Sequence, residues 1–265
     1  MKNFIVIALA FLALPAMAQE KGMARKGDQL SVGSGGIKIT HKGDSTNKAF
    51  ELQIGMLDLG VNSLQDKTNY QSADAQNFLH VAQDAKNSNL FSLRDLKSVN
   101  VNIYPIMVKF NALKTRNQKI SISSGLGLQI YNFRFNKPIS FVNTTEPAVI
   151  MDSISFRKNK LAVTYLTVPL MVTAKTRLVD KTWLVYGAGV SAGYRLSSWT
   201  KQISDERGKQ KNRDQFNLSD FNVCVNGEIG LEGYIRLYAS YQLTNMFDNS
   251  LDQHPFSIGV RFLGL

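Results

Sequence analysis

Residues 221–243 read F-N-V-C-V-N-G-E-I-G-L-E-G-Y-I-R-L-Y-A-S-Y-Q-L. Apolar side chains take almost every second position, and the positions between them hold Asn, Glu, Arg, Ser and Gln. Alternation with a period of two predicts β-strands that have one apolar face and one polar face. Because Leu-Glu-Gly at 231–233 interrupts the pattern, we expect two strands here, joined by a tight turn.

The same alternation recurs along the chain. It predicts eight strands, at 49–60, 97–113, 119–135, 161–177, 182–200, 219–230, 234–246 and 255–263. Each reaches the roughly 9–11 residues that a tilted strand needs to cross a bilayer. Two weaker segments, 37–40 and 139–157, would raise the number to ten if they joined the sheet. Pro105 interrupts the second strand and shifts its apolar phase, which predicts a β-bulge there.

The strands of a soluble β-sandwich also alternate, so the composition of the two faces and the connection lengths must decide between a sandwich and a membrane barrel. The apolar faces run without a charge through the middle of every segment, and a Lys or Arg in hydrocarbon would cost about 2–4 kcal/mol. The opposite faces are rich in Gly, Ser and Asn, which fits a crowded lumen. Tight turns alternate with long polar connections at 61–96, 136–160, 201–218 and 247–254. The sequence therefore predicts an all-β fold, a transmembrane antiparallel up-and-down β-barrel whose turns face the periplasm.

The N-terminal end has the features of a secretory signal peptide. Lys2 precedes an apolar run from Phe4 to Leu14, and Ala16-Met17-Ala18 is a cleavage site of the A-x-A type. We expect a signal peptide at 1–18 that is cleaved after Ala18, an N-terminal periplasmic segment at 19–48 and an outer-membrane barrel at 49–265. Both termini of the mature chain are then periplasmic. The chain carries a formal charge of +11, which in this compartment suits anionic lipid headgroups and not nucleic acid.

The polar face of the quoted stretch predicts contacts inside the lumen. Glu228 and Arg236 share one phase, and a three-residue turn at 231–233 would place them directly opposite each other as an ion pair. We interpret this pair as structural filling of a narrow barrel. Other side chains that we expect to face the lumen are Asn222, Cys224, Asn226, Arg195 and Arg261.

The external connections carry less specific signals. The connection 201–218 is basic, with Lys201, Arg207, Lys209, Lys211 and Arg213. A solvated loop is the simpler interpretation, and contact with lipopolysaccharide phosphates is the functional one. A weak amphipathic helix is expected at 74–86. Aromatic side chains near the loop ends suit an interfacial girdle: Tyr131, Phe133, Phe135, Tyr194 and Trp199.

Catalytic patterns are weak. Gly189-Val190-Ser191-Ala192-Gly193 matches the G-x-S-x-G nucleophile elbow, but it falls in the middle of a predicted strand, where no sharp strand-to-helix turn can lift the serine. His254 lies near Asp252 in a stretch that we expect to be a loop. We expect no catalytic site, and no metal or other cofactor.

With these segments placed, the chain resembles the outer-membrane β-barrel proteins of Bacteroidetes that are often labelled PorT-like or porin-family. The resemblance rests on Y-L-T-V-P-L-M-V-T at 165–173, K-S-V-N-V-N-I-Y-P at 97–105, Y-G-A-G-V-S-A-G-Y at 186–194 and F-S-I-G-V-R-F at 256–262. It implies a Gram-negative outer-membrane protein. The PorT name is linked to secretion of proteins across the outer membrane, but no residues of this chain carry that role over.

Three functions are compatible with such a barrel. The first is a non-enzymatic structural or partner-binding role through the long external loops. The second is a small porin-like channel for ions or solutes, and the third is a lipid-acting outer-membrane hydrolase. The expected partners are outer-membrane lipid and lipopolysaccharide, the barrel-assembly machinery during biogenesis, and a protein bound through the external loops.

Overall fold

The computed structural model describes residues 28–33, 36–41, 50–143, 146–179, 182–233 and 235–263. The expected signal peptide and most of the expected periplasmic segment at 19–48 lie outside the described residues. Within that segment, β1 (Asp28–Gly33) and β2 (Gly36–His41) form a two-stranded sheet. The remainder of the described chain is a barrel with a folded cap.

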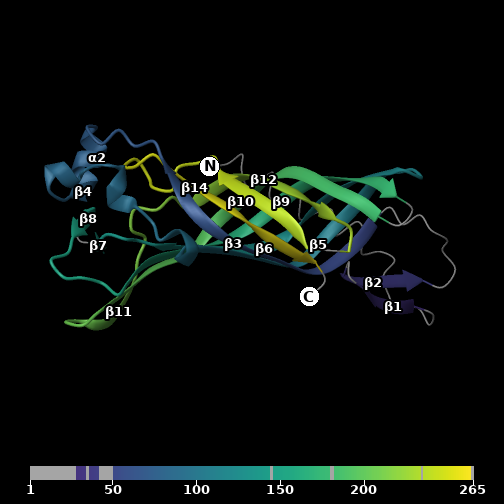
Figure 1. The fold of residues 1–265 in the computed structure, drawn as a ribbon, viewed down its shortest axis with the longest axis horizontal. Coiled ribbons are helices and arrows are strands. Elements are labelled where there is room, and N and C mark those ends of the chain that lie inside the picture. Colours follow the sequence, from purple (N-terminus) through teal and green to yellow (C-terminus); the bar gives the residue numbers. More distant parts are fainter. Residues whose placement is uncertain are drawn as a thin grey trace, which may run out of the picture. The chain divides into compact units, whose positions relative to one another are not determined.

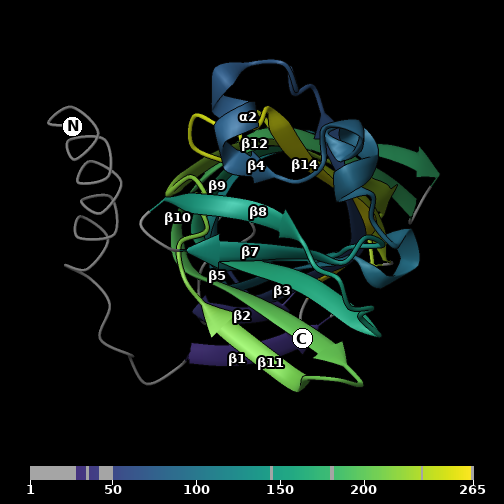
Figure 2. The same ribbon diagram turned by 90° about the vertical axis from the view of Figure 1, so that its left-hand side faces the viewer.

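Eight strands close into a ring (Figures 1 and 2). Going round the ring, every neighbouring pair is antiparallel, and the pairing of β9 with β10 closes the sheet. The strands are β3 (Phe50–Asp66), β5 (Val99–Lys114), β6 (Gln118–Arg134), β9 (Lys158–Val179), β10 (Thr182–Ser204), β12 (Phe221–Leu231), β13 (Arg236–Gln242) and β14 (Gln253–Leu263). The predicted eight-stranded up-and-down barrel is confirmed. The two segments that would have made ten strands do form strands, but neither enters the ring.

The bulge expected at Pro105 is also present. Ile103 pairs with Leu128 and Ile106 with Leu126, so Tyr104 and Pro105 together oppose the single residue between those partners. A proline cannot donate a hydrogen bond to the ladder, and a bulge removes the need for one.

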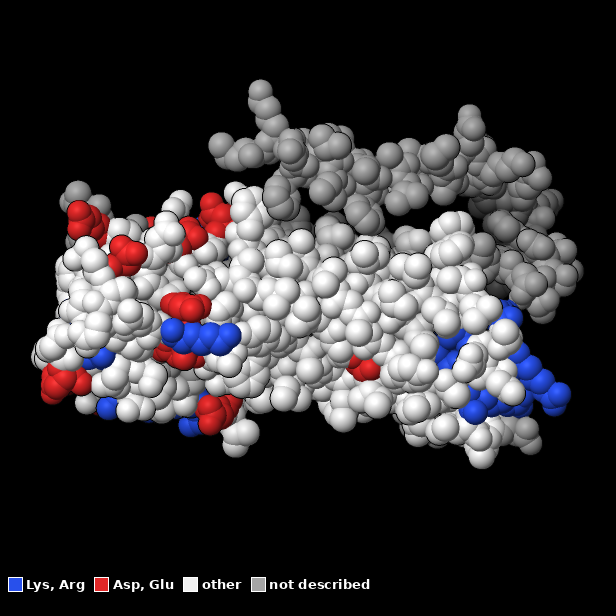
Figure 3. Space-filling view, turned by 90° about the horizontal axis from the view of Figure 1, so that it is seen from above, with Lys and Arg blue, Asp and Glu red and all other residues white. Residues whose placement is uncertain are grey.

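The outer face of the ring is apolar and exposed. Large side chains with a third or more of their surface exposed are found on all eight strands of the ring, among them Leu59, Val108, Leu126, Val168, Val190, Val225, Leu237 and Ile258. On the face seen in Figure 3, charged residues gather toward the two ends, and the band between them shows only one small acidic patch. Water-soluble proteins rarely expose an apolar band of this extent, so the band marks the lipid-facing surface of a transmembrane barrel. Among the described residues, no helix is long and apolar enough to span a membrane.

A cap covers the end of the barrel where the long connections lie (Figure 2). It contains a three-stranded sheet in the order β4-β8-β7 and several short helices. Its elements are α2 (Ala73–Phe78), β4 (Leu79–His80), η2 (Gln83–Ala85), η3 (Ser88–Phe91), η4 (Asp95–Lys97), β7 (Ile139–Asn143) and β8 (Pro147–Met151). The helix expected at 74–86 is wrong beyond residue 78, because Leu79 and His80 extend to pair with Val149 and Ile150 of β8.

The basic connection is not an irregular loop. β10 continues to Ser204, and β11 (Gly208–Arg213) pairs back onto it to form a hairpin. Lys209, Lys211 and Arg213 repeat at every second position, and this alternation is the signal of a strand that the sequence interpretation missed.

The cap and the upper barrel share one hydrophobic core. All four long connections contribute buried side chains to it, including Phe78, Phe91, Phe141, Phe216 and Phe247. From the barrel wall, Tyr131, Phe133 and Phe135 point inward into the same core, and each is at most 3% exposed. Their assignment to an interfacial girdle is therefore wrong. They alternate with outward-facing Ile130 and Asn132, so the pleat turns them towards the lumen.

Candidate functional site: a filled lumen under a folded cap

Four charged side chains form a neutral network inside the barrel, nearer its turn end. Arg261 donates two hydrogen bonds to Asp58, from Nε to Oδ1 at 2.7 Å and from Nη2 to Oδ2 at 2.8 Å. Its Nη1 lies 3.1 Å from Oε2 of Glu228, and Nη1 of Arg236 lies 3.2 Å from the same oxygen. All four residues are less than 9% exposed. Two acids and two arginines balance, which buried charges require because an unpaired one is very costly.

Polar side chains complete this network. Thr173 donates to Oε1 of Glu228 at 2.9 Å, and Asn102 donates to Oδ2 of Asp58 at 3.2 Å. Asp58 was not singled out in the sequence. The signal was available, because Asp58 is the one acid in the middle of its strand and shares the inward phase of Met56 and Gly60.

The structure places Glu228 and Arg236 in one ion pair, but not directly opposite each other. Glu228 pairs with Tyr238 across the ladder, and Gly230 pairs with Arg236. The expected register was therefore wrong by two residues, and the ion pair is diagonal. The turn is centred on Gly233, whose φ of +82° lies in the left-handed region that favours glycine.

The other expected lumen residues also face inward. Asn222 donates to Oε1 of Gln129 at 2.9 Å. Cys224 is fully buried, 3.9 Å from the hydroxyl of Tyr131. These contacts cross the lumen, because β12 and β6 are not neighbours in the ring.

Asn226 and Arg195 complete the predicted set. Asn226 donates to the hydroxyl of Ser191 at 3.0 Å. Arg195 lies near the cap, where its Nη2 is 2.5 Å from Oδ1 of Asp220. Ser191 of the G-x-S-x-G sequence thus sits in mid-strand, only 3% exposed, with no geometry for a nucleophile elbow.

His254 belongs to β14 and not to a loop, which corrects the expectation. One ring nitrogen lies 3.1 Å from the carbonyl oxygen of Gln242, and the other lies 2.7 Å from Oδ1 of Asp252. Its ring also stacks on that of Tyr241, with centroids 5.8 Å apart. Both nitrogens are engaged, so the histidine acts as a link between strand and cap.

The five basic residues of the predicted outer loop divide between two environments. Arg207, in the turn between β10 and β11, forms an ion pair with Asp152 at 2.9 Å. Lys201 lies on β10, directly opposite Lys211 of β11, while Lys209 and Arg213 flank Lys211 on the same face. The structure therefore gathers four of the five on one face of a hairpin.

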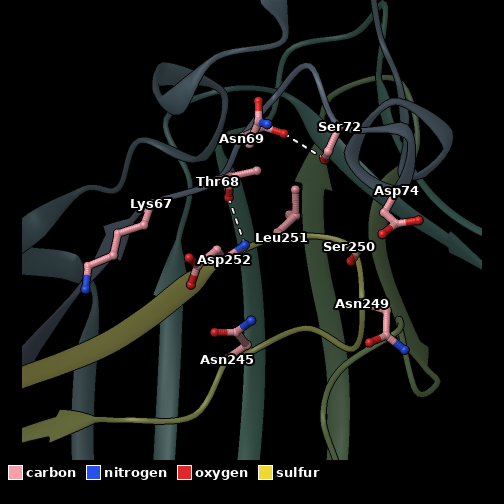
Figure 4. A pocket seen from close by; sticks show the side chains of 10 residues that line it. All are labelled: Lys67, Thr68, Asn69, Ser72, Asp74, Asn245, Asn249, Ser250, Leu251 and Asp252. Atoms are coloured by element: carbon pink, nitrogen blue, oxygen red, sulfur yellow. Dashed lines mark hydrogen bonds between the residues drawn. The ribbon is translucent and has the colours of Figure 1, made fainter.

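The cap also has a polar surface cavity of about 290 Å³ (Figure 4). It lies between the start of the first long connection, after β3, and the connection from β13 to β14, and Asp252 N–H donates to the hydroxyl of Thr68. Beside it, Tyr70 donates to Asp66 at 2.5 Å. Burial, and then this acidic acceptor, raise the pKa of Tyr70 well above its ordinary value, so the hydroxyl stays protonated. The cavity offers amide, hydroxyl and carboxylate groups, and neither His nor Cys is among its lining residues: Lys67, Thr68, Asn69, Ser72, Asp74, Asn245, Asn249, Ser250, Leu251 and Asp252.

Neither a family model nor a curated protein sequence matches this chain. Among solved structures, one that matches is the crystal structure of Ail, the attachment invasion locus protein of Yersinia pestis. The two are 9% identical, and the match covers 80% of this chain and 98% of Ail with a TM-score of 0.28. At this level the likeness adds nothing to the description of the fold, which rests on the strand pairing of the chain itself.

Proposed function

We propose that this protein is a non-conducting, non-enzymatic outer-membrane barrel that presents a rigid cap for binding a partner outside the cell. The observation that carries the proposal is the shared core of the cap. Four connections that are far apart in the sequence bury aromatic side chains against one another and against the upper barrel wall. Loops that only close a barrel have no need of a common core, whereas a stable binding surface does, because preorganisation lowers the entropic cost of association.

The lumen supports the non-conducting part of the proposal. An eight-stranded barrel is only wide enough for side chains to fill. Here the charged network fills the lower part and Tyr131, Phe133 and Tyr165 fill the upper part, each of the three at about 1% exposure. An ion would have to displace both. In planar bilayers we expect no stepwise current from the purified protein, and regular single-channel steps would refute this part and favour a small channel.

The ends of the first and last strands of the barrel support the expected membrane orientation. A long connection follows β3 and another precedes β14, so Phe50 and Leu263 lie on the short-turn side, where Leu263 pairs with Met56. In bacterial outer-membrane barrels the short turns face the periplasm. We further propose that the chain belongs with the Bacteroidetes barrels that it resembles, and that the barrel-assembly machinery inserts it.

Cysteine labelling on intact cells tests this orientation. The native Cys224 is fully buried, so the background is low. Gln71, exposed in the cap, and Arg116, exposed in a turn, serve as matched probes. We expect Gln71→Cys to react with a membrane-impermeant maleimide and Arg116→Cys to react only after the outer membrane is permeabilised. The reverse pattern would place the cap in the periplasm and overturn the proposal.

The non-enzymatic part has its own test. Purified protein incubated with phospholipid or lipid A should leave their masses unchanged. A mass shift that depends on the protein would instead support a lipid-acting hydrolase.

A further inference from the structure

Four basic side chains form a continuous row on the outer wall of the barrel, just below the cap. Arg134 of β6 pairs with Lys160 of β9, Lys160 pairs with Lys201 of β10, and Lys201 pairs with Lys211 of β11. We call these four residues the cation row. Their neighbours Asn159 and Gln202 point to the inner side, where both donate to the carbonyl oxygen of Ile139 in the cap. Side chains alternate along a strand, so the cation row faces outward.

Such a row is unfavourable by itself, because like charges directly opposite each other on neighbouring strands destabilise a sheet. Among the described residues, none of the four forms an ion pair with an acid. Two acids in the neighbouring connections form ion pairs with other arginines, Asp152 with Arg207 and Asp205 with Arg157.

The contacts that the row does make are weak substitutes for an anion. The ammonium of Lys160 is 2.7 Å from the amide oxygen of Asn132 and 4.2 Å from the ring centroid of Trp199. The ammonium of Lys211 lies 4.3 Å from the same ring. The row is thus a place where the protein lacks negative charge.

The height of the row on the barrel wall indicates which molecules supply the missing negative charge. On β6 the last apolar outward side chain is Ile130, and Arg134 follows four residues later. At about 3.3 Å per residue and a tilt of roughly 40°, the row stands on the order of 10 Å above the apolar band. Trp199, one outward position below Lys201 on β10, has the interfacial position typical of tryptophan. The headgroup layer of a bilayer extends about 5–8 Å beyond the hydrocarbon core, so it lies just below the row, within reach of long Lys and Arg side chains.

We propose that the cation row binds the phosphate-bearing headgroups of glycolipids in the leaflet around the barrel. The inference rests on the proposed outer-membrane location. The row lies on the side wall just above the headgroup layer of the lipids that surround the barrel, and long lysine side chains can reach down to the phosphates. Each cation near an anionic surface contributes about fivefold to association. Bound phosphates would also relieve the repulsion within the row.

The experiment uses Trp199 as the reporter, in a Trp183→Phe background that removes the other tryptophan. The full-length mature protein in neutral detergent micelles is titrated with diphosphorylated lipid A, with phosphatidylcholine and, separately, with inorganic phosphate. We expect a saturable change in Trp199 fluorescence with lipid A alone. The double variant Lys160→Gln with Lys201→Gln should bind lipid A about 25-fold more weakly, because each of the two cations contributes about fivefold. The control pair Lys97→Gln with Lys137→Gln removes the same charge from exposed positions outside the row and should leave the binding unchanged.

Circular dichroism and heat-modifiable gel mobility establish first that each variant is a folded barrel. A protein that is soluble and monomeric without detergent would refute the membrane location, and with it this inference. The lipid site alone would be overturned if the folded barrel did not bind lipid A, or if the two variant pairs bound lipid A with the same affinity. An equal response to inorganic phosphate would also overturn it, in favour of a site for soluble anions.

Discussion

The substitution Asp58→Asn tests whether the charges in the lumen hold one another in place. Asp58 is completely buried and accepts two hydrogen bonds from Arg261. The asparagine keeps the shape of the side chain and removes its charge. Two arginines, Arg261 and Arg236, then share Glu228 as their only acid in the network.

The expected cost follows from the geometry. Opposite charges about 4 Å apart attract by about 4 kcal/mol at an effective dielectric constant of 20. Removing one partner of a buried ion pair costs about 3–5 kcal/mol, because the remaining charge stays buried. We therefore expect Asp58→Asn to lower the free energy of unfolding by about 3–5 kcal/mol. Adding Arg261→Met leaves Glu228 and Arg236 as a neutral pair. The free energy of unfolding of the double variant should therefore fall by little more than that of either single variant.

The assay is a double-mutant cycle measured by urea unfolding of the barrel in lipid vesicles, followed by tryptophan fluorescence. The expected coupling energy between the two substitutions is about 3 kcal/mol. Glu51→Gln is the matched control, because Glu51 pairs with Lys109 at 3.4 Å near the barrel rim with its side chain 32% exposed, and such pairs contribute about 1 kcal/mol or less. Additive losses, with a coupling below about 1 kcal/mol, would refute the view that the network acts as one unit.

Three further outcomes are expected. Val190→Arg puts a charge on the lipid-facing band and should cost about 2–4 kcal/mol of folding free energy in bilayers; an unchanged urea midpoint would contradict that placement. Phe141→Ala in the cap core should cost about 3–5 kcal/mol, seen as faster proteolysis of the cap while the barrel keeps its heat-modifiable mobility; loss of both together would show that the cap does not unfold separately. Gly189→Val should prevent folding, because any Cβ there would overlap the carbonyl oxygen of Leu170; a normal refolding yield would show that the strands can separate.

The barrel could be predicted from the sequence because its information is local and periodic. The alternation of apolar and polar residues within each strand shows which side chains point outward. The alternation of long and short connections gives the up-and-down order of the strands. The register is a different matter. A shift of two residues keeps every side chain on its face, so alternation placed Glu228 and Arg236 correctly in the lumen and still left their register wrong by two.

The cap could not be predicted because its information is not local. Phe78, Phe141, Phe216 and Phe247 belong to four separate connections, and the weak periodicity at 74–86 and 139–157 does not indicate which residues of the other connections they contact. They become a core only when the barrel brings the connections together. Only half of the cation row was named from the sequence, as Lys201 and Lys211 of the basic connection. Arg134 and Lys160 were not, since Arg134 and Lys201 are 67 residues apart and become close only through β9.

The way this barrel is filled bears on where its function lies. Glycines at 127 and 189 leave room beside the larger Tyr104 and Met171 of neighbouring strands, so small and large side chains interlock across the wall. The ion network below and the aromatic core above close what is left. Opening a path would require several of these layers to change together, because each is tightly packed against the next. From this filling we infer that recognition takes place on the outer surfaces of the barrel, which are the cap at its end and the cation row on its side.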